Sequence, residues 1–320
     1  MTTILDTHAN NPLNVFSIPL EAFLTSSSSP ARKQIAVHIV DLVTTSSDPA
    51  HALWKLWDAF FTAVVNADSY QTLLALLDTL RAQPPTQPNK VRVGSNALGS
   101  YISAEGKLHW ETLPRFSAQW HDVHDILEAR RDWDGVRDAA PGDHTTATKL
   151  SSRVAEYYLR FCSFSAALLK ATNGSEEKGG VHPIWVFYAC RDVLEYARPR
   201  PQAHDYQPKA YTIPWEEVWA LDVRVAATWV RDGGRALWEV GHEELRRHWA
   251  ASLDSQTELW LRDDGLTVER WYFWEGKLRH LSIEAGILDL ETRGVVGEAA
   301  EVVSDLLRTG AITQPLSLKR

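Results

Sequence analysis

Two carboxylates in an apolar segment are the residues whose types and spacing most directly suggest chemistry. Asp192 and Glu195 lie three residues apart in a stretch that begins at Pro183 and would be apolar on most sides of a helix. A spacing of three places both carboxylates on one helix face. Because Mg²⁺ accepts one or two carboxylates and completes its octahedron with water and substrate phosphates, this pair is a candidate Mg²⁺ site. The alternative is a structural ion pair of Glu195 with Arg191 or Arg198.

A second acidic pair offers another metal site. Asp122 and Asp125 share a helix face in the segment His121-Asp-Val-His-Asp125, where His121 also faces Asp125. The acids could hold Mg²⁺, or the imidazoles could hold a transition metal. The other interpretation is the charged outer face of an amphipathic helix.

The densest aromatic segment, Arg270-Trp-Tyr-Phe-Trp-Glu-Gly-Lys277, combines ring faces with a positive charge. The chain has 14 tryptophans and one methionine, and aromatic faces attract cations. On a helix, Trp271 and Trp274 share a stripe typical of a core, and Phe273 and Lys277 share a neighbouring stripe. Lys277 could hold a phosphate as a point charge, or it could extend to water.

Helices must position these residues, because apolar side chains recur at helical spacing along most of the chain. No run of alternating polar and apolar residues indicates a strand, so the sequence predicts an all-α fold with a single large helical bundle. Gly233-Gly234 is expected to stop or kink one long helix. The predicted helices cover about 32–45, 49–64, 69–80, 120–130, 149–171, 183–195, 215–238, 243–253, 267–285 and 297–308.

The two ends of the chain differ in composition from the predicted bundle. Residues 1–30 are rich in Asn, Pro and Ser, which is typical of a flexible arm. Residues 31–310 form the predicted all-helical domain, and residues 311–320 form a polar tail.

Charge and cysteine content exclude several classes of protein. The formal net charge is −8, from 41 acidic and 33 basic residues, and no basic stripe indicates a general nucleic-acid binder. Cys162 and Cys190 are the only cysteines, which argues against a disulfide framework. Neither a signal peptide nor a membrane span is expected, so the predicted location is cytoplasmic. The oligomeric state is left open.

Several short motifs, taken in their order along the chain, resemble a fungal all-helical family of unknown function. That family is similar to the noncanonical class I terpene cyclases of tropolone-sesquiterpenoid pathways, the humulene synthases. The matching stretches are Leu53-Trp-Lys-Leu-Trp57, Leu113-Pro-Arg-Phe116, Arg131-Asp-Trp-Asp134, Arg160-Phe-Cys-Ser-Phe-Ser-Ala-Ala-Leu168, Cys190-Arg-Asp-Val-Leu-Glu195, Ala226-Ala-Thr-Trp229 and the 270–277 segment.

The resemblance implies a magnesium-dependent sesquiterpene cyclase that acts on a prenyl diphosphate, farnesyl diphosphate. In this interpretation Lys277 and Arg270 bind the diphosphate, and Phe273 shapes the product. The aromatic pocket is expected to be lined by Phe273, Trp274, Trp229 and Trp185. The usual Asp-Asp-x-x-Asp run and its Asn/Ser/Glu partner motif are missing, so only the noncanonical version of this chemistry applies. The alternatives are a non-enzymatic helical binding or scaffold protein and a metal-free catalyst of a pericyclic step in fungal secondary metabolism.

Overall fold

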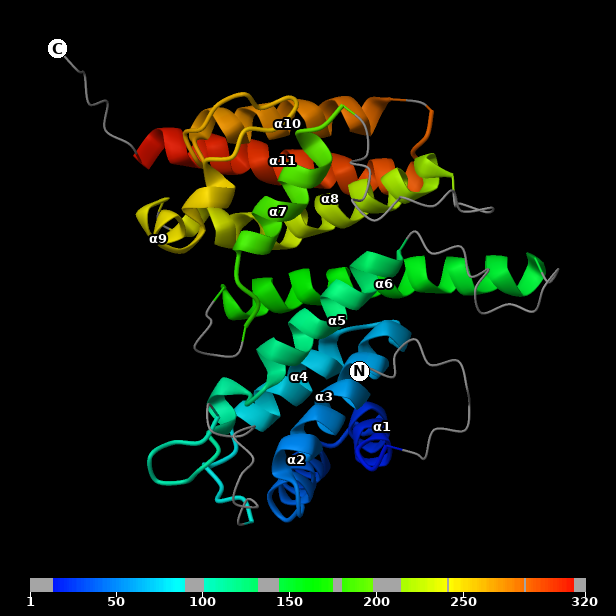
Figure 1. Cartoon of the computed structure of the whole chain (residues 1–320), viewed down its shortest axis with the longest axis vertical. Coiled ribbons are helices and arrows are strands. Elements are labelled where there is room, and N and C mark those ends of the chain that lie inside the picture. The colour runs from blue at the N-terminus through cyan, green and yellow to red at the C-terminus, as the bar shows by residue number, and fades with distance from the viewer. Residues whose placement is uncertain are drawn as a thin grey trace. The chain divides into compact units, whose positions relative to one another are not determined.

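The computed structural model of the chain describes residues 14–89, 101–131, 144–174, 180–197, 214–240, 242–284 and 286–313. Within these residues the chain forms eleven α-helices and no strand, so the all-α prediction is confirmed (Figure 1). The helices are α1 (Ser17–Thr25), α2 (Ser29–Thr44), α3 (Pro49–Asn66), α4 (Gln71–Arg81), α5 (Phe116–Arg130), α6 (His144–Thr172), α7 (Ile184–Leu194), α8 (Trp215–Glu239), α9 (His242–Leu253), α10 (Val268–Ile283) and α11 (Leu290–Thr313).

The chain divides into two compact units. Unit 1 contains residues 1–130, 156–164 and 175–181, and unit 2 contains residues 131–155, 165–174 and 182–320. Helix α6 contributes residues to both. Each unit has its own buried apolar side chains, and the candidate site residues on α7, α8 and α10 belong to unit 2.

Unit 1 is built around edge-to-face aromatic contacts between α3 and α5. Trp57 and Phe60 on α3 contact the ring of Phe116 at centroid distances of 5.1 and 5.9 Å. The buried Trp57 Nε1 donates a hydrogen bond to the carbonyl of Pro114 at 2.7 Å, so its one polar group is satisfied. Asp48 begins α3 by accepting a hydrogen bond from the backbone N–H of His51, as expected of an N-cap residue.

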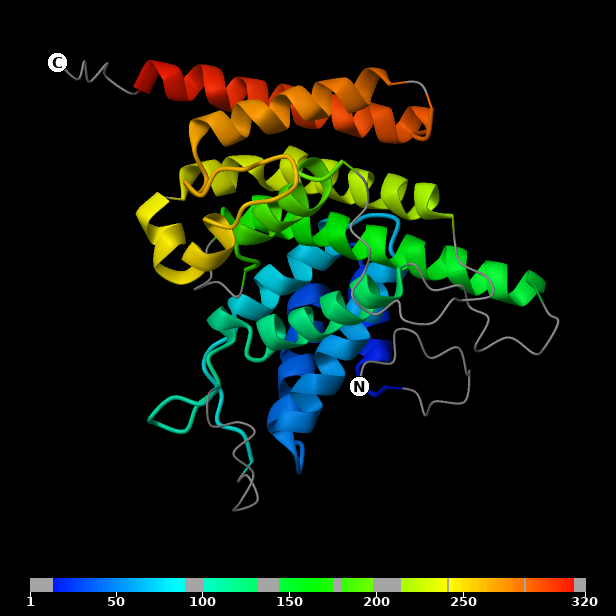
Figure 2. The ribbon, with the colours of Figure 1, turned by 45° about the horizontal axis from the view of Figure 1, so that its top comes forward.

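Unit 2 is a set of helices packed around α8. Helix α8 packs most extensively against α7 and α11, and α10 packs against α11 and α7. Figure 2 shows α10 and α11 running side by side along most of their lengths. Because α10 contacts α7, residues near position 195 and residues near position 270 come together.

A glycine allows close packing in the middle of α8. A Cβ atom on Gly233 would lie 2.5 Å from Leu169 Cδ2 and 2.9 Å from Val186 Cγ2, which is too close for any side chain. Helix α8 continues through Gly233 and Gly234 to Glu239, whereas the sequence indicated a stop or kink there. The glycine therefore serves the approach of α6 and α7 to α8.

The predicted N-terminal arm, residues 1–30, contains a helix. Residues 14–30 are described, and α1 buries Leu20 and Phe23, which are 2% and 0% exposed. Helix α2 begins at Ser29, with Pro30 in its first turn, where a missing N–H is tolerated. The tail at 311–320 lies largely outside the described residues. No described helix combines the length and the apolar content that a membrane crossing requires.

Candidate functional site

Helix α10 carries most of the predicted site residues. Thr267 caps its N-terminus by accepting a hydrogen bond from the backbone N–H of Arg270. A spacing of four residues then puts Arg270 and Trp274 on one buried stripe, and Phe273 and Lys277 on a neighbouring, partly exposed stripe. The two stripes have very different surroundings.

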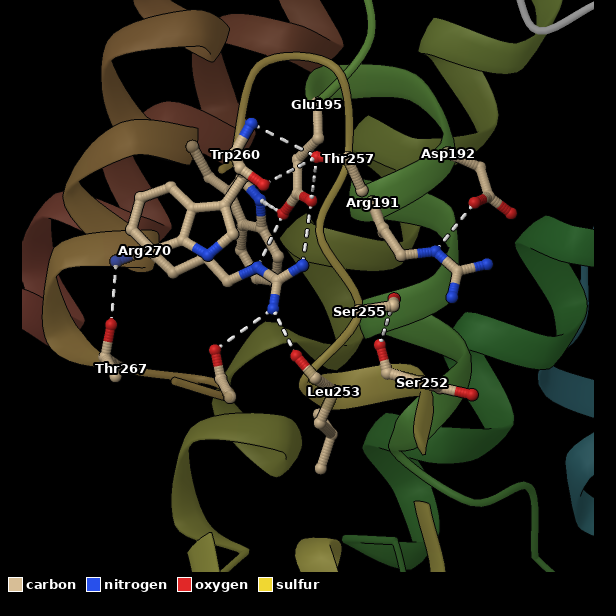
Figure 3. Close-up of polar contacts among 12 residues, drawn as sticks. Arg191, Asp192, Glu195, Ser252, Leu253, Ser255, Thr257, Trp260, Thr267 and Arg270 are labelled. Atoms are coloured by element: carbon tan, nitrogen blue, oxygen red, sulfur yellow. Dashed lines mark hydrogen bonds and ion pairs between the residues drawn. The ribbon is translucent and has the colours of Figure 1, made fainter. Parts of the chain in front are cut away.

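The buried stripe is organised by an ion pair between Arg270 and Glu195, both 0% exposed (Figure 3). Arg270 Nε donates to Glu195 Oε1 at 2.7 Å and Arg270 Nη2 donates to Oε2 at 2.8 Å, which makes the pair bidentate. Trp274 Nε1 donates to Oε1 at 2.8 Å, and Thr257 Oγ1 donates to Oε2 at 3.0 Å. Each oxygen of the Glu195 carboxylate thus accepts two hydrogen bonds.

The remaining donor groups of Arg270 are also satisfied. Arg270 Nη1 donates to the carbonyl oxygens of Leu253 at 2.8 Å and Gly265 at 3.0 Å. The guanidinium lies 4.8 Å from the centroid of the Phe187 ring and 5.6 Å from that of Trp260. A buried charge requires this degree of pairing. The ion pair is therefore structural, and Arg270 is enclosed away from any diphosphate.

The loop between α9 and α10, residues 254–267, closes over the ion pair. The Leu259 N–H donates to the carbonyl oxygen of Glu195 at 2.9 Å, and the Thr257 N–H donates to that of Trp260 at 2.8 Å. Thr257 and Trp260 are 7% and 6% exposed. This 254–267 loop therefore excludes water from the ion pair without forming a helix or strand.

Cys190 on α7 lies in the same buried environment. Burial raises the pKa of its thiol well above the ordinary value, and the Glu195 carboxylate raises it further, while Arg270 opposes this effect. The thiol stays protonated, which makes Cys190 a buried packing residue rather than a nucleophile.

Asp192 does not share the surroundings of Glu195. Its side chain is 42% exposed and accepts a hydrogen bond from Arg191 Nε at 2.9 Å. Figure 3 shows the two carboxylates apart, with no interaction drawn between them. Glu195 is the C-cap residue of α7, and its N–H still donates to the carbonyl oxygen of Arg191. The two carboxylates are therefore separated by their different partners, Arg191 for Asp192 and Arg270 for Glu195.

The predicted Mg²⁺ site at Asp192 and Glu195 does not fit this geometry. Both Glu195 oxygens are engaged by Arg270, Trp274 and Thr257, and a second carboxylate is not directed to the same point. A hard divalent cation needs free carboxylate oxygens that converge. The structural ion pair that the sequence offered as the alternative is present, but the partner is Arg270 rather than Arg191, and Arg198 lies outside the described residues.

The alternative metal residues, Asp122 and Asp125, are exposed on α5 in unit 1. Asp125 Oδ1 lies 3.5 Å from His124 Nδ1, and one ligand atom each of His124, Asp125 and Glu128 fall within 4.8 Å of one another. Asp122 is outside that group. Exposed acids on one helix are common without a bound ion, so this cluster assigns no metal.

Lys277 lines a groove of about 310 Å³ in unit 2, here named the Lys277 groove. Its apolar wall comes from the end of α7, the start of α8 and the segment after α10. The side chains of that wall include Leu194, Tyr196, Trp215, Trp219 and Ile287. Trp215 is 50% exposed and Ile287 is 46% exposed, so large apolar surface faces the opening.

The charged part of the Lys277 groove comes from the second half of α10 and its C-cap residue, Glu284. Lys277, His280 and Glu284 line it, and His280 Nε2 lies 3.5 Å from Glu284 Oε2. Lys277 Nζ lies 5.6 Å from the centroid of the Phe273 ring. Among the described residues no carboxylate lies within ion-pair distance of Lys277. The groove thus offers an unpaired cation beside apolar surface.

Most of the predicted site residues do not line this groove. Trp274 and Trp229 are 0% and 2% exposed and pack in the core of unit 2. Trp185 packs against the Tyr188 ring at 5.6 Å, and Phe273 contacts Lys277 from the side of the groove. Of the residues named from the sequence, Lys277 is the one that lines it.

The other residues that line the groove, Tyr196, Trp215, Trp219 and His280 among them, were not predicted as site residues from the sequence. One signal was available, because positions 277, 280, 281 and 284 share a helix face, as do 215 and 219. The approach of α8 to α10 is a tertiary contact, and helical periodicity on either helix does not reveal it.

One comparison with known proteins found a match. A family described as "Protein of unknown function (DUF3632)" matches residues 57–278, which include α7, α8 and the part of α10 that carries Lys277. No curated protein and no solved structure matches the chain.

Proposed function

The chain belongs to the DUF3632 family of proteins of unknown function, and we propose that its Lys277 groove binds a small molecule with an apolar body and an anionic group. The carrying observation is the unpaired ammonium of Lys277 beside exposed Trp215. Small-molecule sites combine apolar walls with a few polar groups that fix orientation.

Two physical features support this proposal. Exposed large apolar side chains gathered in a concave site are typical of ligand-binding surfaces, and Trp215 and Ile287 meet that description. The ammonium group of Lys277 lies over the Phe273 ring, which limits the directions from which water reaches it. Such a charge attracts an anion more strongly than a fully hydrated surface lysine does.

Direct binding measurements test the proposal. Isothermal titration of the full chain with a series of apolar anions, which includes carboxylates and farnesyl diphosphate, should give saturable binding of at least one of them. Lys277→Ala should weaken that binding about tenfold, which corresponds to about 1.4 kcal/mol. The control is Lys33→Ala, which removes an exposed lysine from α2 and should leave binding unchanged. The proposal would be disproved if no apolar anion binds, or if Lys277→Ala binds the anion as tightly as Lys33→Ala does.

Cyclisation of farnesyl diphosphate is the reaction that the resemblance predicts, and it stays a prediction. In support of this reaction, the groove contains Lys277 for the anion and aromatic side chains that can stabilise a carbocation. Against it, Asp192 and Glu195 do not converge as metal ligands. Incubation with farnesyl diphosphate and Mg²⁺, followed by gas chromatography of the extract, tests it. A hydrocarbon that disappears in Lys277→Ala supports the cyclase.

A small-molecule binding protein and a metal-free catalyst of a pericyclic step would both use the groove, whereas a scaffold protein would not need it. A binding protein would retain the ligand unchanged, whereas a catalyst of a pericyclic step would release an isomer of it. Recovery of the bound compound by mass spectrometry and chromatography separates these two outcomes.

A further inference from the structure

The charge of the Lys277 groove restricts the class of anion that it can hold. Its lysine, histidine and carboxylate side chains are Lys277, His280 and Glu284, and Tyr196 adds a phenol. His280 and Glu284 face each other, with Nε2 and Oε2 3.5 Å apart. Lys277 is therefore the cation that remains for a ligand. Glu284 lies about two turns further along, at the end of α10, and adds a net negative charge when His280 is neutral.

This balance disfavours a multiply charged head group. A phosphate monoester carries about −1.5 to −2 at neutral pH, and a diphosphate carries at least as much. One ammonium cannot neutralise that charge, and Glu284 would repel the excess. Binding of a diphosphate would require a metal, and the predicted metal ligands Asp192 and Glu195 do not line the groove.

The apolar wall favours a ligand with a substantial hydrocarbon or aromatic body. Trp215 and Trp219 lie four residues apart on α8, so their rings are neighbours on one face. Leu194 and Leu281 are 2% and 8% exposed and complete the wall. The volume of about 310 Å³ lies at the small end of the range for ligand sites, about 300–1,000 Å³.

We propose that the natural ligand of the Lys277 groove is a singly charged amphiphile, an apolar carboxylate, and that it binds without a metal ion. This inference rests on the proposed function and narrows its ligand class. The carboxylate lies at Lys277 Nζ, and the apolar body lies along Trp215 and Trp219. Glu284 acts as a specificity-determining residue because it opposes a second negative charge.

Ligands matched in chain length test this inference. Titration calorimetry would compare decanoate with decyl phosphate below their micelle concentrations, each with Mg²⁺ and with a chelator. We expect decanoate to bind at least about tenfold more tightly than decyl phosphate, with no effect of Mg²⁺. Lys277→Ala should weaken both ligands, because it removes the cation that holds either head group, and Trp215→Ala should weaken both ligands equally.

Glu284→Gln provides the sharper variant, because Glu284 is exposed and its replacement leaves the core intact. It should raise the affinity for decyl phosphate several-fold while decanoate changes less. Tighter binding of decyl phosphate or farnesyl diphosphate than decanoate, or a requirement for Mg²⁺, overturns the carboxylate inference but leaves groove binding of an apolar anion in place. Absence of binding by all of these ligands overturns both.

Discussion

Two neighbouring stripes of α10 place a positive charge in opposite environments. Arg270 is fully buried and meets the Glu195 carboxylate and two backbone carbonyls, so all its donor nitrogens have partners. Lys277 lies less than two turns further along the same helix, partly exposed, with an aromatic ring beside it and no described carboxylate in reach. Residue type alone therefore does not mark a binding site. A candidate binding site is indicated instead by a charge without an ion-pair partner that lies beside exposed apolar side chains.

The largest expected effect tests the buried side of this comparison. Arg270→Met leaves the Glu195 carboxylate buried without its counter-charge, so we expect the free energy of unfolding to fall by about 3–5 kcal/mol. Urea denaturation followed by circular dichroism measures it. The matched control is Arg279→Met, which removes exposed ion pairs to Glu275 and Glu301 from the same helix and should leave the free energy of unfolding nearly unchanged. Similar losses in both variants would contradict a structural role for the buried pair.

Gly233 in the core and Gly276 on the open side of α10 differ in the space available for a side chain. Gly233→Ala places a Cβ atom 2.5 Å from Leu169 Cδ2, so we expect a loss of about 1–3 kcal/mol in the free energy of unfolding. Gly276 lies beside Lys277 on α10, and a Cβ atom added there would point into open space, so Gly276→Ala should stabilise the helix by about 0.5–1 kcal/mol. Chemical denaturation of both variants checks the opposite signs.

The far end of α7 should show a smaller, pH-dependent effect. His182 Nδ1 accepts a hydrogen bond from the Ile184 N–H at 3.0 Å, and its ring lies 4.0 Å from that of Trp249. Burial, with a smaller contribution from His248, lowers the pKa of His182 from 6.5 to about 4. Between these values the unfolded chain binds a proton that the folded chain does not, so stability should fall as the pH decreases from 6.5 to about 4.

His182→Asn tests this dependence because asparagine can accept the same hydrogen bond but does not titrate. Melting temperatures of the native chain and of this variant, measured from pH 7 to pH 4, should diverge as the pH falls, with the variant losing less. Parallel curves would show that protonation of His182 is not coupled to folding.

The smallest effect is expected on the open stripe. Lys277→Met removes a partly exposed charge that has no described ion-pair partner, so stability should change by no more than about 0.5 kcal/mol. The same urea titration measures it. A loss comparable to that of Arg270→Met would show that Lys277 serves folding rather than binding.

The helices of this fold could be predicted from the sequence, because capping residues and apolar periodicity are local patterns. Asp48 before Pro49 and Thr267 before the aromatic segment marked helix starts, and both caps are present. The continuity of α8 through Gly233 was not predictable, because the glycine is required by Leu169 and Val186 from other helices. Local preference for a break is overridden there by packing.

The candidate site was harder to predict from the sequence, because tertiary contacts determine it. The predicted carboxylate pair depended on helical spacing alone, which does not specify the partner toward which each side chain turns. The partner of Glu195 lies 75 positions away at Arg270, a pairing that no local pattern encodes. Lys277 could be predicted because it lies in the aromatic segment 270–277, four residues after Phe273. Trp215 and Trp219 were missed because their approach to α10 is decided by tertiary packing.

The 254–267 loop has a consequence for the dynamics of unit 2. Its two ends are tied by Arg270 Nη1 to the carbonyls of Leu253 and Gly265, and its middle is tied by the Leu259 amide to Glu195. The loop cannot lift without exposing a buried ion pair to water. Its Leu259 amide should therefore exchange hydrogen with solvent as slowly as a core helix does, and this irregular segment belongs to the same cooperative unfolding unit as α7 and α10.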